Sequence, residues 1–237
     1  MNARRNPAVQ VIDLGRVEYT RAWEIQTEYF QSILDVKKRN RELPDDAQVE
    51  TRNYLLLCEH PAVVTLGKSG DQKNLLATPD ELRARGATYV HTNRGGDITF
   101  HGPGQLVVYP VIDLENFFTD INRYMRSLEE AVIRTLRRHT LEGSRIPGLT
   151  GVWISDSGPA RKICAMGVKT SRWVTMHGLA LNANVDLAYF DLIVPCGIGE
   201  KEVTSMKKER GREIDMEQLK KQLTGDLVDV FGMTVQA

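Results

Sequence analysis

One glycine-rich stretch, residues 94–109, constrains this chain more than any other segment. It reads Arg-Gly-Gly-Asp-Ile-Thr-Phe-His-Gly-Pro-Gly-Gln-Leu-Val-Val-Tyr, so four glycines and a proline surround one arginine and one histidine. Glycine lets the backbone reach positive φ and approach a ligand closely. The apolar run 106–112 predicts a buried strand, which would anchor the loop and hold Arg94 and His101 in fixed positions. A glycine-rich β-hairpin that only turns the chain is the alternative interpretation.

Periodic apolar residues predict three long helices and one short helix in the rest of the chain. The long helices are expected over residues 20–38, 120–139 and 216–230. The Thr-Pro-Asp-Glu sequence that begins at Thr78 combines an N-cap, a proline at the first helical position and two acids in the first turn. It predicts a short helix that stops at Gly86.

Apolar runs of the β type predict eight strands, of which the last three form an antiparallel meander. These runs span residues 9–14, 53–58, 63–66, 89–91, 106–112, 151–154, 162–170 and 174–183. Residues 143–150 are expected to form turns. Because the chain has no internal repeat and no low-complexity linker, we expect one mixed α/β domain over residues 1–237, with a small C-terminal subdomain as the alternative.

Bulk properties exclude several classes of protein. A chain of 237 residues can bury a sizeable core, and its 31 basic and 31 acidic residues balance. This balance gives no reason to expect nucleic acid or a membrane as a partner. No secretory signal or membrane-spanning segment is visible, and three cysteines are too few for a disulfide framework. We therefore expect a soluble cytoplasmic protein with free thiols and, because histidines and cysteines lack paired ligand spacing, no metal site.

Cys196 is the candidate nucleophile, since it lies on a Pro-Cys-Gly turn where a thiol can be held and exposed. A thiol with a pKa of about 8.5 needs a neighbour that favours the thiolate. The candidates are Lys162, His101, His177 and Lys169. An ammonium would stabilise the thiolate by charge, whereas a neutral amine would take the thiol proton. A small buried cysteine and a solvated strand lysine are the alternatives without function.

Several segments together resemble the lipoate-protein octanoyltransferase family. The similarity runs from about Glu59 to Met206 in the order of that family. The segments that carry it are the Glu-His-Pro turn at 59–61, the glycine-rich stretch, Arg-Lys-Ile at 161–163 with Ala-Met-Gly-Val at 165–168, His-Gly-Leu-Ala-Leu-Asn at 177–182, Pro-Cys-Gly at 195–197 and Val-Thr-Ser-Met at 203–206. The resemblance implies the fold of biotin and lipoate protein ligases, an α/β (α+β) fold in which a mixed, largely antiparallel sheet is flanked by helices.

The resemblance also implies roles for particular residues. Cys196 would carry the acyl group as a thioester, and Lys162 would lower the pKa of its thiol. The residues that would line the acyl site are Arg94, Gly95, Gly96, Asp97, Ile98, Thr99, Phe100, His101, Ala165, Met166, Gly167, Gly178, Leu179 and Ala180. For His101 and His177 we favour orientation of a carbonyl over service as a base.

This chain departs from the family pattern at two places. Cys164 stands where a small residue is expected, and strand alternation should place it on the same face as Lys162. This second thiol could then be mistaken for the nucleophile. Ala165 and Met166 replace a commoner Ser-Leu pair, so a hydroxyl contact is absent there.

The implied reaction moves an octanoyl or lipoyl group from acyl carrier protein to a lysine of a lipoyl domain, as the first step of endogenous lipoate biosynthesis. The acceptors would be 2-oxoacid dehydrogenases and the glycine cleavage H protein. A thioester-to-amide transfer is downhill, so neither ATP nor another cofactor is expected. The basic residues Lys207, Lys208, Arg210 and Arg212 are candidates for meeting acidic carriers, and a solvated surface run is the alternative.

Two other functions remain open at this point. An ATP-dependent lipoate or biotin protein ligase would share the fold and would need no cysteine. A non-catalytic module that binds acyl carriers would keep its function without Cys196.

Overall fold

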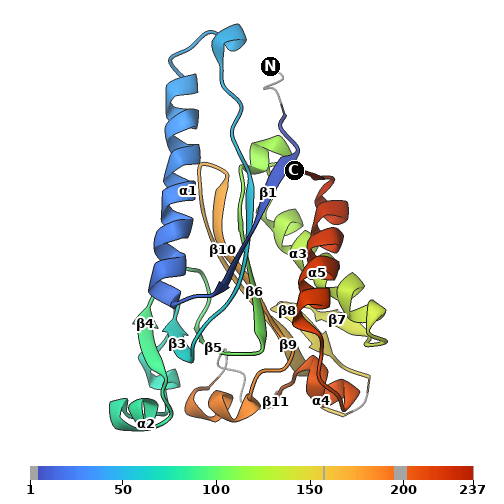
Figure 1. Cartoon of the computed structure of the whole chain (residues 1–237). Coiled ribbons are helices and arrows are strands. Elements are labelled where there is room, and N and C mark those ends of the chain that lie inside the picture. Colours follow the sequence, from blue (N-terminus) through green and yellow to red (C-terminus); the bar gives the residue numbers. More distant parts are fainter. Residues whose placement is uncertain (1–4, 157, 195–201, 237) are drawn as a thin grey trace.

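A twisted sheet forms the centre of the computed structural model, which describes residues 5–156, 158–194 and 202–236 (Figure 1). Within those residues the sheet has nine strands in the order β12-β1-β2-β6-β10-β9-β8-β7, with β11 paired to β9. A smaller sheet has the order β4-β3-β5. The strands are β1 Ala8–Arg16, β2 Tyr54–Glu59, β3 Val63–Leu66, β4 Thr88–His91, β5 Ile98–His101, β6 Gln105–Val111, β7 Gly143–Ile146, β8 Leu149–Ile154, β9 Arg161–Ser171, β10 Val174–Asn182, β11 Glu202–Val203 and β12 Thr234–Val235.

Helices cover both faces of the large sheet. The α-helices are α1 Tyr19–Asn40, α2 Pro79–Ala84, α3 Ile121–Arg138, α4 Met206–Arg210 and α5 Met216–Phe231, and the 3-10 helices are η1 Asp45–Ala47, η2 Gln72–Asn74, η3 Leu114–Asn116 and η4 Leu187–Leu192. Figure 1 shows α1 on one side of the sheet and α3 with α5 on the other. Alternation along β10 serves both cores, because Leu179 and Leu181 pack with α3 and α5 while Met176 and Ala180 pack with α1.

The predicted helices and most predicted strands are confirmed to within a few residues. Helix α2 begins with the expected cap: the Thr78 hydroxyl accepts from the Glu81 N–H, and the Glu81 carboxylate accepts from the Thr78 N–H. The meander β8-β9-β10 is antiparallel, as predicted. Four described strand pairs are parallel and the others antiparallel, so the sheets are mixed and largely antiparallel.

The glycine-rich stretch contains a strand that the sequence interpretation missed. Ile98–His101 forms β5, which pairs with β3 in the small sheet, whereas β6 pairs with β2 and β10 in the large sheet. The hairpin alternative is therefore wrong, because the two strands belong to different sheets. The chain crosses between them at Gly104, which has φ 81° and lies against the backbone of Asn184. Residues 143–150, expected to be turns, form most of the hairpin β7-β8.

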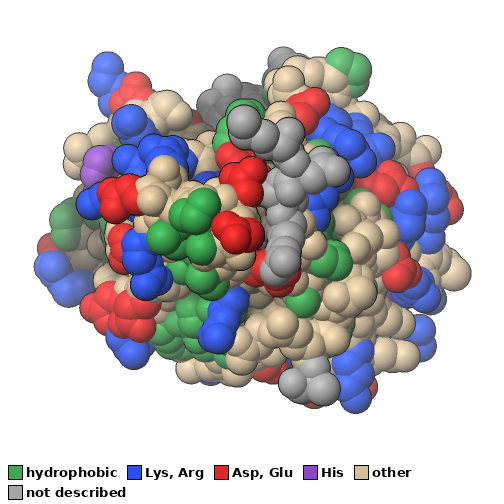
Figure 2. All heavy atoms as spheres, turned by 90° about the horizontal axis from the view of Figure 1, so that it is seen from above, with side chains coloured by type: hydrophobic (Ala, Val, Ile, Leu, Met, Phe, Trp, Pro, Cys, Tyr) green, Lys and Arg blue, Asp and Glu red, His purple; other side chains and the backbone are tan. Residues whose placement is uncertain are grey.

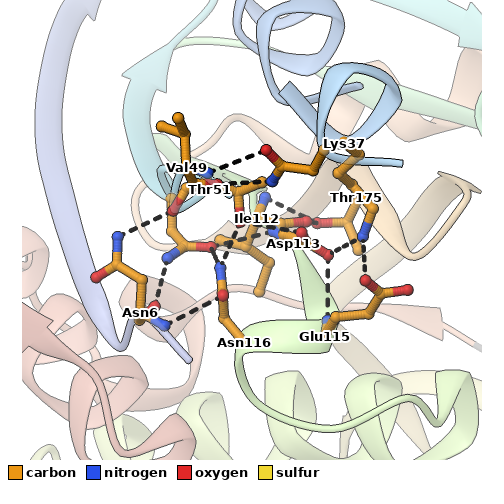
Figure 3. A network of polar contacts seen from close by, with 11 residues as sticks. Asn6, Lys37, Val49, Thr51, Ile112, Asp113, Glu115, Asn116 and Thr175 are labelled. Atoms are coloured by element: carbon orange, nitrogen blue, oxygen red, sulfur yellow. Dashed lines mark hydrogen bonds and ion pairs between the residues drawn. The ribbon is translucent and has the colours of Figure 1, made fainter. Parts of the chain in front are cut away.

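A buried polar network ties the C-terminal part of α1 to the sheet (Figure 3). Asp113 accepts from Lys37 Nζ at 2.6 Å and from Thr51 Oγ1 at 3.0 Å, and its N–H donates to Asn53 Oδ1. Asn116 donates to Thr51 and Asn53. Lys37 lies near the C-terminal end of α1, so these contacts anchor that end of the helix to the sheet. Tyr19, the first residue of α1, lies at the other end of the helix.

Charged side chains of both signs are interspersed over the face shown in Figure 2, and apolar side chains appear in small groups between them. This pattern agrees with the equal numbers of basic and acidic residues. None of the helices in the described ranges is long and apolar enough to cross a bilayer.

Candidate active site

A cavity of about 520 Å³ lies between the large sheet and the loop that precedes β5. Strands β6, β9 and β10 form one wall, the loop forms another, and the turn between β7 and β8 contributes Gly148. The predicted residues that line it are Lys162, Arg94, Gly95, Gly96, Asp97, Ile98, Thr99, His101, Ala165, Met166, Gly167, Gly178, Leu179 and Ala180. Segments far apart in the sequence therefore meet at one cavity, although their binding of substrate stays a prediction.

Phe100 was also predicted to line the acyl site, and the structure corrects this prediction. Its ring stacks on Tyr189 with a centroid distance of 4.6 Å and packs edge-on against Phe190, in the core of the small sheet. Its neighbours Thr99 and His101 line the cavity, whereas the Phe100 ring packs into this core. Phe100 supports the strand from behind and lies outside the cavity wall that the described residues form.

Glycines allow the loop to lie directly on the sheet. The Gly95 N–H donates to Val168 O at 2.9 Å, and a Cβ on Gly167 would lie 2.6 Å from Gly95 O. A Cβ on Gly178 would lie 2.1 Å from Val108 O. A side chain at Gly167 would therefore push the loop off the sheet, and one at Gly178 would push β10 away from β6 within the sheet.

Arg94 and Asp97 hold this loop in place from within the cavity wall. The Arg94 guanidinium is buried and donates to the backbone and side-chain oxygens of Thr65 and to Gly95 O. The Asp97 carboxylate accepts from Asn74 Nδ2 at 2.5 Å. The fixed position expected for Arg94 is present, and its side-chain hydrogen bonds tie the loop to Thr65 of β3.

His101 is held in one orientation by a chain of side-chain hydrogen bonds. His101 Nδ1 lies 2.7 Å from Gln105 Oε1, Gln105 Nε2 donates to Asn182 Oδ1, and Asn182 Nδ2 donates to Thr204 O. With Nδ1–H as the donor, Nε2 is left as an acceptor. Burial, together with His60 and Arg94, lowers the pKa of His101 to about 3, so the ring is neutral near pH 7. A neutral ring of fixed orientation suits the predicted orienting role.

Two tyrosines that were not among the predicted site residues also line the cavity. The ring of Tyr19, the first residue of α1, stacks on His101 with a centroid distance of 5.7 Å. The Tyr109 hydroxyl donates to His60 Nε2 at 2.7 Å, and His60 Nδ1 donates to Val17 O. Burial lowers the pKa of His60 to about 4. Tyr109 ends the glycine-rich stretch, which was the only signal for it in the sequence.

His177 lines the cavity in a strained backbone conformation. Its φ is 58°, which is uncommon for a residue other than glycine. Its N–H donates to Gln26 Oε1, and its Nε2 lies 2.7 Å from Asn93 Oδ1. Burial, together with Arg94 and Lys169, lowers the pKa of His177 to about 3. The contacts to α1 and to the segment before the loop maintain this conformation.

Lys162 lines the cavity with only 8% of its surface exposed. Its Nζ lies 4.6 Å from the centroid of the Trp153 ring. Its backbone is paired on both sides, with Trp153 of β8 and Val203 of β11. The alternative of a solvated strand lysine is therefore wrong.

Cys164 does not share a face with Lys162, which corrects the expectation from strand alternation. Trp153 pairs with Lys162 and Val152 pairs with Cys164, so Ile163 is an extra residue in β9. Such a bulge interrupts the alternation of side chains. Cys164 is fully buried in the core beneath α3, and burial raises the pKa of its thiol well above the usual range.

Cys196 and the rest of its Pro-Cys-Gly turn lie outside the described residues, so the structure leaves the expected contact with Lys162 untested. The described residues on either side of this segment are Val194 and Glu202. The Val194 N–H donates to Asn74 O. Val203 then pairs directly with Lys162.

The basic cluster is partly paired within the molecule. Lys207 forms an ion pair with Glu213 at 2.9 Å, and Arg210 donates to Thr140. Lys208 and Arg212 are exposed. Among the described residues, no three His, Cys, Asp or Glu side chains are grouped to hold a metal ion.

Comparison with known proteins identifies the family. Residues 18–228 match the model of the lipoyl protein ligase A/B catalytic domain. The chain is 53% identical to an octanoyltransferase of Flavobacterium psychrophilum, over 97% of this chain and 99% of the relative. It is 51% identical to an octanoyltransferase of Cytophaga hutchinsonii, over 100% of this chain and 98% of the relative. The chain belongs to the octanoyltransferase family. It is an acyltransferase, and octanoyl transfer places it in lipoate biosynthesis.

Solved structures confirm the predicted fold class. A bipartite lipoate protein ligase from Thermoplasma acidophilum superposes with a TM-score of 0.70 at 16% identity, over 97% of this chain and 86% of that one. A biotin protein ligase from Aquifex aeolicus superposes with a TM-score of 0.55 at 12% identity, over 94% and 70%. At these identities the comparison concerns the fold alone.

Proposed function

We propose that this octanoyltransferase takes an octanoyl or lipoyl group from acyl carrier protein and passes it to a lysine of a lipoyl domain through a thioester on Cys196. The observation that supports this most is the buried amine of Lys162 on the wall of the cavity. A lysine is rarely buried without a specific role or partner. The Pro-Cys-Gly turn supplies the second half of the proposed pair.

In the first step, the Cys196 thiolate attacks the carrier thioester. A bond forms between the Cys196 sulfur and the acyl carbon, and the bond to the carrier sulfur breaks. The Lys162 ammonium gives a proton to the departing carrier thiolate. The products are an octanoyl-enzyme and the free carrier thiol.

In the second step, the neutral amine of the acceptor lysine attacks the acyl carbon. An amide bond forms, and Cys196 leaves as a thiolate. Lys162, now neutral, takes the proton that the attacking amine loses and returns to the ammonium form. Both steps balance without nucleotide or metal.

The cavity has a suitable size and lining for an eight-carbon chain. Its volume lies within the usual range for small-ligand sites of about 300–1,000 Å³. Val107, Met166, Leu179 and Ala180 provide apolar lining. At about 0.8 kcal/mol per buried methylene, the acyl chain would contribute roughly 5 kcal/mol to binding.

The partners follow from the proposed reaction. The donor is acyl carrier protein, and the acceptors are the lipoyl domains of 2-oxoacid dehydrogenases and the glycine cleavage H protein, in the cytoplasm. Lys208 and Arg212, near the strand that pairs with Lys162, are exposed basic groups that suit an acidic carrier.

Transfer from octanoyl-carrier protein in a nucleotide-free buffer tests this proposal against the ligase alternative. We expect the amide product on a lipoyl domain without ATP. Product that forms only from free octanoate with ATP would make the chain a ligase. A Cys196→Ser variant with unchanged transfer would instead remove the thioester from the mechanism.

A further inference from the structure

The aromatic residue beneath Lys162 suggests how the lysine is held. Lys162 Nζ lies 4.6 Å from the centroid of the Trp153 ring, and only 1% of the Trp153 surface is exposed. A lysine ammonium over the face of tryptophan is attracted by the electron density of the ring. This attraction is strongest where water is excluded.

The backbone of β8 and β9 sets this contact. Trp153 and Lys162 form a direct cross-strand pair, beside the bulge at Ile163. Gly151 has φ 116°, and a Cβ there would lie 2.5 Å from Cys164 O and 3.7 Å from Lys162 Cε. A glycine is therefore needed beneath the lysine stem, and the bulge frees Lys162 from the core face that Cys164 occupies.

The carboxylates near this position are already matched by arginines. Glu129 of α3 accepts from the Gly151 N–H and forms ion pairs with Arg126 and Arg145. Glu209 of α4 forms an ion pair with Arg161, the neighbour of Lys162 on β9. The indole face thus adds a contact specific to the ammonium form, in surroundings where the acidic groups have their own partners.

We propose that Trp153 is a positioning residue that holds Lys162 as an ammonium at the cavity wall. Lys162 would then act on the resting Cys196 thiol as a fixed positive charge and would give up its proton only to the departing carrier. This inference rests on the proposed function, and it decides between the two roles that the sequence left open for the lysine. A neutral amine would gain no such attraction from the ring.

The test measures how fast Cys196 is alkylated by iodoacetamide as a function of pH, with peptide mapping to separate it from other thiols. The variants are Trp153→Leu, which removes the ring, and Trp153→Phe, which keeps a weaker one. Without the ring the ammonium is no longer held in place, so we expect an alkylation rate at pH 7 that is about 10-fold lower in Trp153→Leu, as a rise of about one unit in the pKa of the Cys196 thiol would give, and about 3-fold lower in Trp153→Phe. The midpoint of the pH profile should move upward in the same order.

Trp173→Leu is the matched control, because Trp173 lies on the turn between β9 and β10 with 37% of its surface exposed. It should leave the profile unchanged. In a Lys162→Met background, Trp153→Leu should cause no further change, since the ring acts through the lysine. Thermal unfolding of each variant identifies any that fails to fold. If Trp153→Leu fails to fold, Trp153→Phe is compared with the wild type instead.

An unchanged midpoint in folded Trp153→Leu or Trp153→Phe would overturn the inference, as would an equal effect of Trp153→Leu with and without Lys162. Intact-mass measurement after incubation with octanoyl-carrier protein distinguishes failure of this inference from failure of the proposed function. An acyl adduct on Cys196 with no effect of Trp153 removes only the role of the ring. Absence of the adduct from the wild type removes the proposed function itself.

Discussion

Two lysines of strand β9 each lie over an aromatic ring, and the comparison between them shows what distinguishes a candidate catalytic lysine. Lys162 lies 4.6 Å from the Trp153 ring, and Lys169 lies 5.5 Å from the Phe30 ring on α1. Lys162 lines the cavity and is buried, whereas Lys169 is half-buried and lies outside the wall that the described residues form. Residue type and contact type are the same, so the surroundings make the difference.

Those surroundings come from the strands on each side. Lys162 lies between β8 and β11, beside a bulge and a glycine that let its stem run toward the cavity. Lys169 belongs to a regular part of β9, where it pairs with Met176 of β10 and its side chain reaches α1. Local backbone irregularity therefore selects one lysine for the site.

The largest expected difference is between Lys162→Met and Lys169→Met. Single-turnover transfer from octanoyl-carrier protein should fall by about 100-fold or more in Lys162→Met, since proton transfer contributes about 10²–10⁴-fold to such steps. Lys169→Met should change the rate by less than about 2-fold. Equal losses in the two variants would show that the cavity position of Lys162 has no special role.

The next effect concerns the glycine under Lys162. In Gly151→Ala, the new Cβ would overlap Cys164 O, and the φ of 116° is unfavourable for alanine. We expect a loss of about 3 kcal/mol in the free energy of unfolding, measured by chemical denaturation. Gly158→Ala is the control, because Gly158 has φ 70° with open space around it and should cost only about 1 kcal/mol. A milder effect at Gly151 than at Gly158 would contradict the packing described.

The third effect concerns Cys164→Ala, which changes a residue of the same strand that faces the core. Cys164 is fully buried on the face away from the cavity, so its removal leaves a small void and should lower stability by about 1–2 kcal/mol. The rate of acyl transfer should stay within about 2-fold of the wild type. Loss of the acyl adduct in Cys164→Ala alone would mean that the nucleophile has been assigned to the wrong thiol.

The smallest expected effect is that of Lys169 on the pH dependence of the free energy of unfolding. Burial lowers the pKa values of His60, His101 and His177 to about 4, 3 and 3 in the folded state, while the unfolded chain binds protons near pH 6.5. These three histidines should therefore add no pH dependence to the free energy of unfolding above that pH. Below it, stability should decrease by up to about 1.4 kcal/mol per pH unit for each histidine.

Lys169 contributes to the lowered pKa of His177, after burial and Arg94. Lys169→Met should bring that pKa closer to its unfolded value, so the variant should lose slightly less stability than the wild type between pH 7 and pH 3, where the folded-state pKa is reached. Denaturation curves at both pH values measure the difference, which should be a few tenths of a kcal/mol. A larger loss in the variant would contradict the sign of this interaction.

Much of the fold could be predicted from local signals. The Thr78 cap, the apolar period of the long helices and the three-strand meander all appear in the structure near their expected bounds. The fold also brings together most of the residues that the family motifs predicted to line the cavity. These features depend on residues close in sequence or on a pattern shared with relatives.

The remaining features depend on contacts between distant segments. The bulge at Ile163 has no sequence signal of its own, so alternation placed Cys164 on the wrong face. The crossing from β5 to β6 depends on the partner strands, and Tyr19 reaches the cavity only because α1 packs on the sheet. The Trp153 contact is likewise a tertiary one.

Intact mass with peptide mapping, after incubation with octanoyl-carrier protein and no nucleotide, tests the central claim most directly. We predict one octanoyl group on the peptide that contains Cys196 in the wild type and in Cys164→Ala, and none in Cys196→Ser. An octanoyl group on another residue, or full transfer to a lipoyl domain by Cys196→Ser, would contradict the account.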